Sequence, residues 1–339
     1  GVRLTVTLRD VARRAGVDVS TVSRVVRGER NFSVRAETRE RILQVAAELD
    51  YRPNGIARSL KSSFTRTLGM LIPDITNPIF PAIYKGVEDT ARQLGYSVIL
   101  VNTGTRSQEE DPNIALLREK RVDGFILATA FTADALIERL ERDRYPAVLV
   151  NRRMPGMTER FVAPDDALGS RLAMAHLMAL GHRRIAHISG PLYTETGLSR
   201  FTAYRRSLNE NALPFVASWV QESDFNEEGG YRAMAQLLQA PELPTAVFCG
   251  NDLAAVGAMR MARERGLELP RDLSIVGFND LPWTDRIQPS LTTIRIPLYE
   301  MGAMAARMLL QVIAGERPDP PFWLAPPELV IRASTAPPL

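Results

Sequence analysis

Residues 18–26 carry side chains suited to contacting the bases of DNA. On a helix, the 3.6-residue period separates them into a buried face of valines and an outward face of small and polar residues. The outward face holds Val19, Ser20, Ser23 and Arg24. An arginine can donate two parallel hydrogen bonds to guanine in the major groove, and serine hydroxyls bond to several bases. We therefore expect these four residues to contact DNA, with Arg24 as the guanine contact.

Two further helices are predicted to hold this helix in place. The first begins after Thr7, whose side chain can cap it. Gly16 allows the sharp turn that ends it, and Asp18 can cap the next helix. The third helix has one apolar face, formed by Thr38, Ile42, Val45, Ala46 and Leu49. Two short helices joined by a tight turn and packed on a third are typical of the helix-turn-helix motif.

Charge is distributed unevenly along the chain. Residues 1–66 contain 14 Lys and Arg against 7 Asp and Glu, whereas the whole chain, with 42 against 39, has a formal net charge of only +3. The remainder is therefore mildly acidic. A basic module at one end of a chain favours binding to phosphate groups, so the charge pattern supports double-stranded DNA as the partner.

Composition limits the class of protein. The chain has 339 residues, of which 45% are hydrophobic and 24% charged, as is typical of a globular protein. It contains no apolar run long enough for a membrane span and no recognisable secretion signal, so we expect a cytoplasmic protein. The single cysteine, Cys249, lies in an apolar segment and is expected to be a buried strand residue.

The sequence lacks the common motifs of catalysis and metal binding. It has no Gly-x-Gly-x-x-Gly dinucleotide motif, no Gly-x-x-x-x-Gly-Lys-Ser/Thr phosphate loop and no Gly-x-Ser-x-Gly nucleophile turn. Its three histidines, His176, His182 and His187, show no metal-ligand spacing. We therefore expect no metal, no cofactor and no enzymatic activity.

Beyond residue 66, short apolar segments alternate with helical patterns. The apolar segments predict strands at 68–73, 97–101, 124–128, 147–150, 184–189, 245–249, 274–277 and 291–296. The helical patterns cover 79–94, 166–180, 253–265 and 298–314. Such alternation predicts parallel sheets covered by helices on both faces, and its length favours two lobes. Ligands of such folds bind beyond the carboxyl ends of the strands.

Ten motifs along the chain have the order and spacing of a known family. In the basic module they are Asp10-Val11-Ala12, Thr21-Val22-Ser23-Arg24, Thr38-Arg39, Tyr51-Arg52-Pro53-Asn54 and Ala57-Arg58-Ser59-Leu60-Lys61. In the remainder they are Asn77-Pro78, Leu180-Gly181-His182-Arg183-Arg184-Ile185, Gly250-Asn251-Asp252, Gly277-Phe278 and Leu291-Thr292-Thr293. From residue 7 to residue 334 the chain resembles the lactose repressor and galactose repressor (LacI/GalR) family of bacterial transcription regulators.

The resemblance implies an all-α helix-turn-helix head and an α/β body of two periplasmic-binding-protein-like lobes, each with a doubly wound parallel sheet. On this basis we assign residues 1–52 to the DNA-binding domain, 53–65 to a hinge helix and linker, and 66–339 to the effector-binding and dimerisation domain. The lobes are expected to comprise residues 66–163 with 292–325, and residues 164–291 with 326–339. No heptad pattern follows residue 334, so a homodimer is expected.

The resemblance also adds DNA contacts outside the second helix. It implies that Thr7 and Tyr51 contact DNA. It further implies that Leu60 of the hinge wedges into a base step of the minor groove and kinks the duplex. The residues expected beside it are Asn54, Ala57 and Lys61. Residues 54–61 are too few for a stable isolated helix, so DNA is expected to help fold them.

An effector is expected in the cleft between the lobes. The residues that match those lining the family's cleft are Ile79, Phe80, Asn151, Arg200, Phe225, Asn251 and Asn279. Family members that bind neutral sugars usually have aspartate where Asn151 and Asn279 stand. Loss of two carboxylates with Arg200 retained favours an anionic ligand such as a sugar acid. A neutral-sugar pocket that has lost these acids is the second interpretation left open.

Together these features predict a sequence-specific DNA-binding transcriptional regulator of the repressor type. We expect it in the bacterial cytoplasm, at the nucleoid. It is expected to bind a palindromic operator as a homodimer under the control of a small metabolite, a sugar, a sugar acid or a related compound. The alternative function is a two-lobed solute-binding sensor without DNA-binding activity. A gel-shift assay with the DNA upstream of the gene distinguishes the two.

Overall fold

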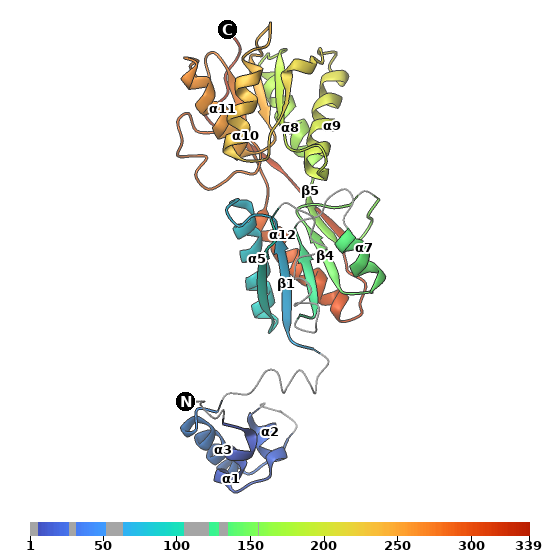
Figure 1. Cartoon of the computed structure of the whole chain (residues 1–339), viewed down its shortest axis with the longest axis vertical. Helices are drawn as coiled ribbons and strands as arrows, with labels where there is room; N and C mark the ends of the chain where they lie inside the picture. Colours follow the sequence, from blue (N-terminus) through green and yellow to red (C-terminus); the bar gives the residue numbers. More distant parts are fainter. Residues whose placement is uncertain (1–5, 27–31, 52–63, 105–121, 129–134, 155) are drawn as a thin grey trace. The chain divides into compact units, whose positions relative to one another are not determined.

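The computed structural model describes residues 6–26, 32–51, 64–104, 122–128, 135–154 and 156–339. Contacts along the chain separate it into two compact units, Gly1–Thr65 and Arg66–Leu339. We call the first unit the head and the second the body (Figure 1). No helix in the described ranges is both long and apolar enough to cross a membrane.

The head contains α1 (Leu8–Ala15), α2 (Val19–Val26) and α3 (Ala36–Glu48). Thr7 caps α1, because its backbone N–H and its hydroxyl both donate to the Asp10 carboxylate, at 2.9 and 2.6 Å. Gly16 then ends α1 in a left-handed conformation, with φ of 64°, which glycine adopts at little cost. The Asp18 carboxylate accepts the Ser20 N–H at 2.7 Å and so begins α2. The predicted helix-turn-helix is confirmed.

Apolar side chains from the three helices pack into one small core. Its buried members are Val11, Ala12, Ala15, Val22, Val25, Ile42, Val45 and Ala46. Val26, Thr38 and Leu49, which the helical period also placed there, are only half-buried because they lie at or near helix ends. The core determines which face of α2 stays exposed.

The first lobe of the body is built on a parallel sheet with the strand order β11-β5-β4-β3-β1-β2. The strands are β1 (Thr67–Ile72), β2 (Ser97–Asn102), β3 (Gly124–Leu127), β4 (Ala147–Val150), β5 (Phe161–Pro164) and β11 (Phe322–Ala325). Alternate residues of β1 point to opposite faces. Leu68 and Met70 pack with α5 (Ile79–Gln93) and α12 (Leu298–Ile313), whereas Leu71 packs with α7 (Ala135–Arg142).

Two glycines allow α5 and α12 to approach closely. A Cβ atom on Gly86 would lie 2.0 Å from the carbonyl oxygen of Tyr299, and one on Gly302 would lie 1.9 Å from that of Ile83. No other residue type fits at such distances without moving a helix backbone. The first lobe therefore holds α12, which comes late in the sequence, firmly against α5.

The second lobe is built on a parallel sheet with the strand order β7-β6-β8-β9. These strands are β6 (Ile185–Ser189), β7 (Val220–Glu222), β8 (Ala246–Cys249) and β9 (Ser274–Val276). Its helices are α8 (Asp166–Ala179) and α9 (Glu195–Glu210) on one face, and α10 (Glu227–Leu237) and α11 (Asp252–Glu264) on the other. Cys249 is fully buried among the latter pair, as expected, and burial raises the pKa of its thiol.

The chain passes between the lobes at three places in the described residues. The first pass runs from β5 into α8, and the others are β10 (Thr293–Arg295) and β12 (Glu328–Val330), which pair with each other in antiparallel fashion. Near them, the Asp280 carboxylate forms ion pairs with the guanidinium groups of Arg295, at 2.7 Å, and Arg332, at 2.6 Å. These ion pairs tie the second lobe to the connecting strands.

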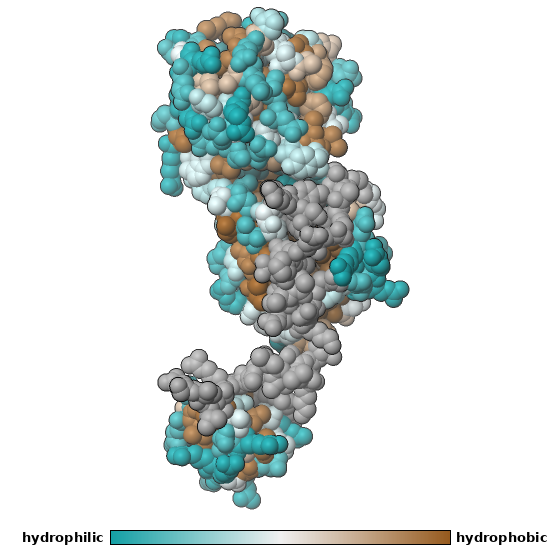
Figure 2. Space-filling view, viewed as in Figure 1, coloured by the Kyte–Doolittle hydropathy of each residue, from teal (hydrophilic) through white to brown (hydrophobic). Residues whose placement is uncertain are grey.

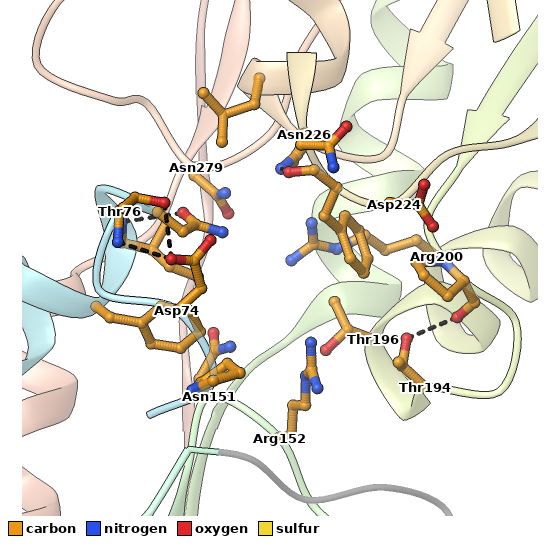
Figure 3. A pocket seen from close by; sticks show the side chains of 18 of the residues that line it. Asp74, Thr76, Asn151, Arg152, Thr194, Thr196, Arg200, Asp224, Asn226 and Asn279 are labelled. Atoms are coloured by element: carbon orange, nitrogen blue, oxygen red, sulfur yellow. Dashed lines mark hydrogen bonds between the residues drawn. The ribbon is translucent and has the colours of Figure 1, made fainter. Parts of the chain in front are cut away.

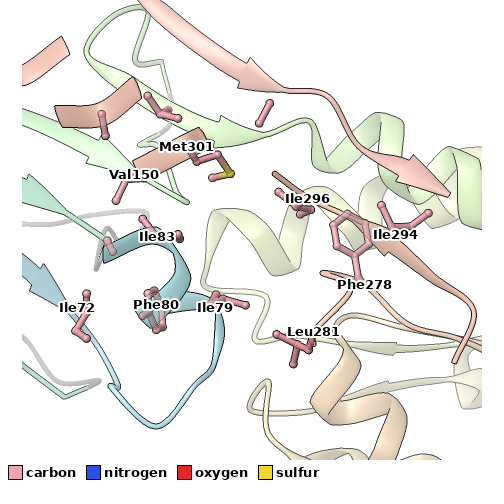
Figure 4. Close-up of a cluster of buried hydrophobic side chains, with 14 of the residues drawn as sticks. Ile72, Ile79, Phe80, Ile83, Val150, Phe278, Leu281, Ile294, Ile296 and Met301 are labelled. Carbon is pink, nitrogen blue, oxygen red and sulfur yellow. The ribbon is translucent and has the colours of Figure 1, made fainter. Parts of the chain in front are cut away.

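Apolar packing also continues from one lobe to the other. Ile79 and Phe80 of α5 belong to the same buried cluster as Phe278 and Ile294 of the second lobe and its connection (Figure 4). Burial of this kind is favourable in proportion to the area removed from water. The cluster includes Ile294 of the second pass, and two of its members, Ile79 and Phe80, also line the cavity between the lobes.

Candidate effector cavity and DNA-binding helix

The outward face of α2 carries the four side chains expected to contact bases. Val19, Ser20 and Arg24 are exposed, and Ser23 is half-buried. The Arg24 guanidinium lies 5.0 Å from the centroid of the Phe32 ring, a cation–π distance that favours one orientation of the arginine. The face is thus free of core packing and available to a groove of DNA.

The other expected DNA contacts are distributed over the head. Thr7 precedes α1 and is exposed, although its hydroxyl already donates to Asp10. Tyr51 follows α3, and its half-buried side chain packs against the head core. Asn54, Ala57, Leu60 and Lys61, and with them the whole expected hinge contact, lie outside the described residues.

A cavity of about 360 Å³ lies between the two lobes of the body. All seven side chains that the sequence assigned to an effector cleft line it: Ile79, Phe80, Asn151, Arg200, Phe225, Asn251 and Asn279. Polar side chains from both lobes face this space (Figure 3). The lining segments follow the carboxyl ends of β1, β4, β6, β7, β8 and β9, which is where ligands of parallel α/β folds bind.

Three of the lining residues have left-handed backbone. The φ angles are 68° at Asn151, 57° at Phe225 and 120° at Asn279. Asparagine tolerates this region better than most residues, but phenylalanine does so at a cost. The Asn251 amide donates to the Phe225 carbonyl at 2.8 Å, and the Phe225 ring lies where a Cβ on Gly190 would be. Neighbouring groups thus hold the phenylalanine in a strained position against the cavity, as is common at functional sites.

Helices α5, α9, α10 and α11 begin at the wall of the cavity. Lining side chains cap three of them: Thr194, Asn226 and Asn251 accept backbone N–H groups at 3.1, 2.7 and 2.9 Å. The amino-terminal end of a helix carries partial positive charge and unbonded N–H groups. Their convergence favours a ligand with electron-rich or negatively charged oxygen atoms.

Arg200 lies in the cavity lining, as the sequence predicts, but its charge is not left over to favour an anionic ligand. Its side chain is buried, and two of its nitrogens lie 2.7 Å from the Asp166 carboxylate, while a third donates to the Gly250 carbonyl. Its guanidinium also lies 3.6 Å from the centroid of the Phe278 ring. Burial raises the pKa of Asp166 to about 6, against the opposing effect of Arg200. The arginine therefore shapes the wall, but its charge is already matched within the protein.

A different arginine, Arg152, lines the same cavity without a matching carboxylate. It directly follows Asn151, and among the described residues it makes no hydrogen bond and no ion pair within 4 Å. Burial lowers the pKa of Arg152 to about 10, so that the side chain stays cationic at neutral pH. Sequence reasoning missed it because the matching motif drew attention to Asn151 alone. The signal that could have found it is its position two residues after a strand, which nearly applies to Arg153 as well.

Other polar residues of the lining were also missed. They are Asp74 and Thr76 after β1, Tyr193 and Thr196 near the start of α9, and Asp224 after β7. The Thr196 hydroxyl is buried without a hydrogen-bond partner among the described residues. The side-chain amides of Asn151 and Asn279 likewise have no partner among the described residues. They line the cavity and can serve as donors or acceptors.

Two family models match the chain. Residues 7–54 match the bacterial regulatory proteins of the lacI family, and residues 174–335 match the periplasmic binding protein-like domain. Among solved structures, the lac repressor dimer bound to operator and the anti-inducer ONPF superposes with a TM-score of 0.89 and 31% identity, covering 98% of this chain and 99% of that one. The expected fold class, a helix-turn-helix head with a two-lobed body, is confirmed.

Curated relatives match over nearly the whole chain. The ribose operon repressor of Halalkalibacterium halodurans is 37% identical over 334 residues, which cover 97% of each protein. Catabolite control protein A of Priestia megaterium is 35% identical over 342 residues, covering 98% of this chain and all of the relative. At such identity and coverage, the head, the body and their order along the chain are shared, and the chain belongs to the lacI family of bacterial regulatory proteins.

Proposed function

We propose that this member of the family is a transcriptional repressor that binds a two-fold-symmetric operator as a homodimer and responds to a small polar metabolite. The head supplies a basic surface and an exposed recognition helix. The body supplies the cavity, with Ile79, Phe80, Phe225 and the polar residues as its contacts. The protein acts in the bacterial cytoplasm, at the nucleoid. The cavity binds its ligand and converts nothing.

One observation carries the proposal: the cavity draws its walls from both lobes. Asn151 and Phe80 belong to the first lobe, whereas Asn251 and Asn279 belong to the second. A ligand that contacts both lobes stabilises the arrangement in which both sets of contacts are made. It thereby shifts the population between conformations of the body, and operator affinity follows that population.

The test is an operator-binding assay with the full-length protein and the DNA upstream of its own gene. We expect a specific complex whose affinity changes when a cavity ligand is added. A protein with a functional cavity that binds no DNA, specific or random, would instead be a solute-binding sensor. Fluorescence anisotropy with labelled duplexes measures DNA binding, and calorimetric titration measures ligand binding to the cavity.

Operator affinity should fall steeply with salt. Each phosphate neutralised by a basic side chain releases condensed counterions, so the logarithm of the affinity falls linearly with the logarithm of the salt concentration. A dimer that contacts about 6 to 10 phosphates loses about 10³- to 10⁵-fold in affinity between 50 and 200 mM salt. An affinity that does not change over this range would contradict a phosphate-binding head.

Replacing Arg24 with alanine should weaken operator binding by about 1 to 3 kcal/mol and relax the preference for one base pair. The reason is that a bidentate contact to guanine distinguishes that base from the other three. Affinities for the operator, for operators changed at single positions and for random DNA measure the effect.

Arg13→Ala is the matched control, because it removes an equal charge from α1, where Arg13 is exposed. It should change the affinities for operator and random DNA by the same factor. If Arg24→Ala also weakens both kinds of DNA equally, Arg24 contacts phosphate and does not read a base.

A further inference from the structure

The cavity contains one corner where polar atoms are buried and unused. The Nε of Arg152 and the hydroxyl of Thr196 are both enclosed, and neither has a hydrogen-bond partner in the part of the chain that the structure describes. Both side chains point into the cavity (Figure 3). Burying a donor without a partner is unfavourable, so two such donors in one cavity indicate that a bound molecule completes them.

We infer that Arg152 and Thr196 form a subsite for an anionic oxygen group, a carboxylate or a phosphate, on the effector. This inference rests on the proposed function, because it names the chemical class of the ligand in the same cavity. A guanidinium and a hydroxyl are donors suited to such oxygens, and the arginine matches a planar carboxylate or a phosphate.

The charges around the cavity support an anion at this subsite. Of the two cations in the lining, Arg200 is matched by Asp166 at 2.7 Å, whereas no carboxylate lies within 4 Å of Arg152 in the described residues. The neighbouring Arg153 forms an ion pair with Glu195 at 3.1 Å, so this carboxylate already has a cationic partner. Glu195 and Asp166 still favour the charged form of Arg152 through space, but they do not bond to it.

The two acids that line the cavity are occupied as well. The Asp74 carboxylate accepts the N–H and the hydroxyl of Thr76, at 2.9 and 2.7 Å. The Asp224 carboxylate lies 3.2 Å from the guanidinium of Arg232. Each acid thus has a donor of its own, but only Asp224 has a cationic one, so the charge of the exposed Asp74 stays unmatched. A cation left over in an enclosed wall, at the amino-terminal ends of several helices, favours a negative charge on the ligand.

The subsite also joins the lobes. Arg152 follows β4 in the first lobe, and Thr196 lies in the first turn of α9 in the second. The Arg153–Glu195 ion pair bridges the same two segments one residue away on each side. An anion bound by both Arg152 and Thr196 would add a second bridge beside it, and would thereby favour the closed arrangement of the lobes.

Matched pairs of ligands, in which a neutral group replaces the carboxylate of the acid, test the inference. The intact protein is titrated calorimetrically with D-glucuronate and D-glucuronamide, and with D-gluconate and D-glucitol. Inorganic phosphate, followed by its effect on thermal unfolding, probes the subsite without any sugar skeleton. We expect a carboxylate to bind at least about tenfold tighter than its neutral partner, a difference of about 1.4 kcal/mol, or inorganic phosphate to raise the Tm.

Two variants locate the effect. Arg152→Gln should abolish the preference for the anion, while Arg206→Gln, which removes the same charge from the exposed face of α9, should leave the ratio of acid to neutral affinity unchanged. Thr196→Val, of nearly equal volume, should reduce that ratio in part. Preference for carboxylates without a phosphate effect identifies a carboxylate ligand, and the reverse identifies a phosphate ligand.

Three results would overturn the inference: neutral partners binding as tightly as the acids, no response to any of these anions, or an anion effect that persists in Arg152→Gln. Operator binding is measured on the same samples. If a neutral ligand binds in the cavity and changes operator affinity, the proposed regulatory function stands and only the anionic subsite is wrong.

Discussion

Replacing Arg200 with alanine should destabilise the body by about 3 to 5 kcal/mol, the largest effect we expect from a single substitution. The substitution leaves the carboxylate of Asp166 in a fully enclosed position without its partner at 2.7 Å. It also removes the cation stacked on Phe278 and the donor to the Gly250 carbonyl. Equilibrium unfolding in urea, followed by circular dichroism, measures the free energy of unfolding.

A surface pair on the same helix provides the control. Arg206 and Glu210 lie 2.6 Å apart on α9, with 69% and 47% of their side chains exposed. Exposed pairs of this kind contribute about 0 to 1 kcal/mol, so Arg206→Ala should cost little. Comparison of the two variants separates the effect of burial from that of ion pairing.

A double variant distinguishes an uncompensated charge from lost packing. Arg200→Met with Asp166→Leu replaces the buried pair by apolar groups of similar size, and should recover most of the lost stability. Recovery shows that the unpaired carboxylate causes the damage. If the double variant is as unstable as Arg200→Ala, the guanidinium acts chiefly through its contacts with Phe278 and Gly250, and our account of the pair is wrong.

The same pair explains why sequence reasoning misassigned the charge of the cavity. Arg200 was expected to favour an anionic ligand because it matches a residue of the family's cleft, and the structure does place it in the lining. Its partner, Asp166, lies 34 residues earlier and begins a helix of its own. Only the folded arrangement of α8 against α9 brings the two together. Spacing along a chain identifies which residues reach a site but cannot show which of them neutralise each other.

Arg152 illustrates the reverse case. From the sequence it is one of two consecutive arginines after a strand, and nothing distinguishes it from Arg153. In the structure, one turns into the cavity and the other pairs with Glu195 of the opposite lobe. Consecutive side chains point in different directions, and only the fold shows which of the two faces the cavity. A local sequence pattern does not show these directions.

Strands of the body were predicted well where an uninterrupted apolar segment marks them. The segments that became β1, β3, β4, β6 and β8 are buried strongly enough for composition alone to identify them. The strands β5, β7, β11 and β12 were not predicted. β7 and β12 have only three residues each, β5 ends at a proline, Pro164, and Pro326 and Pro327 separate β11 from β12. Such segments form strands because neighbouring strands supply partners, which is a tertiary effect.

The helix-turn-helix of the head could be predicted from local sequence more completely than the cavity. The turn at Gly16 and the caps at Thr7 and Asp18 depend on residues within a few positions of one another, so the sequence contains their cause. The cavity instead collects residues from both ends of the body. The seven lining residues that were predicted came from family resemblance, whereas Asp74, Thr196 and Asp224 required the fold.

Acidification should destabilise the protein through His187 as the pH falls from about 6.5 to about 4. This histidine is fully buried in the second lobe, between the rings of Tyr204 and Phe248 at 4.9 and 4.8 Å. Burial lowers the pKa of His187 to about 4. Its Nδ1 bonds to the Phe248 carbonyl at 2.8 Å, and its Nε2 has no partner among the described residues. A second proton would therefore sit on an enclosed, unpaired nitrogen.

Stability falls on acidification because the unfolded state binds the proton of His187 more readily than the folded state does. In the unfolded chain this group has an ordinary pKa near 6.5, so between pH 6.5 and 4 the unfolded state binds more protons than the folded one. Stability is thus complete above pH 6.5 and declines as the pH falls. A depression of this size corresponds to about 3 kcal/mol, since one pKa unit is about 1.4 kcal/mol.

Comparison with His187→Phe isolates this contribution. Phenylalanine keeps the stacking against Tyr204 and Phe248 but cannot take up a proton, and it leaves the Phe248 carbonyl without its donor at every pH. The variant should therefore be less stable near neutrality, by about 1 to 3 kcal/mol, and lose less stability on acidification. Burial also lowers the pKa of His176 and His182, so the wild-type slope includes them and only the difference between the two curves belongs to His187. The unfolding free energies of the wild type and the variant, measured from pH 8 to pH 4, should converge as the pH falls. Only the wild type has a histidine here whose protonation favours the unfolded state. If the curves stay parallel, His187 does not resist protonation in the folded protein.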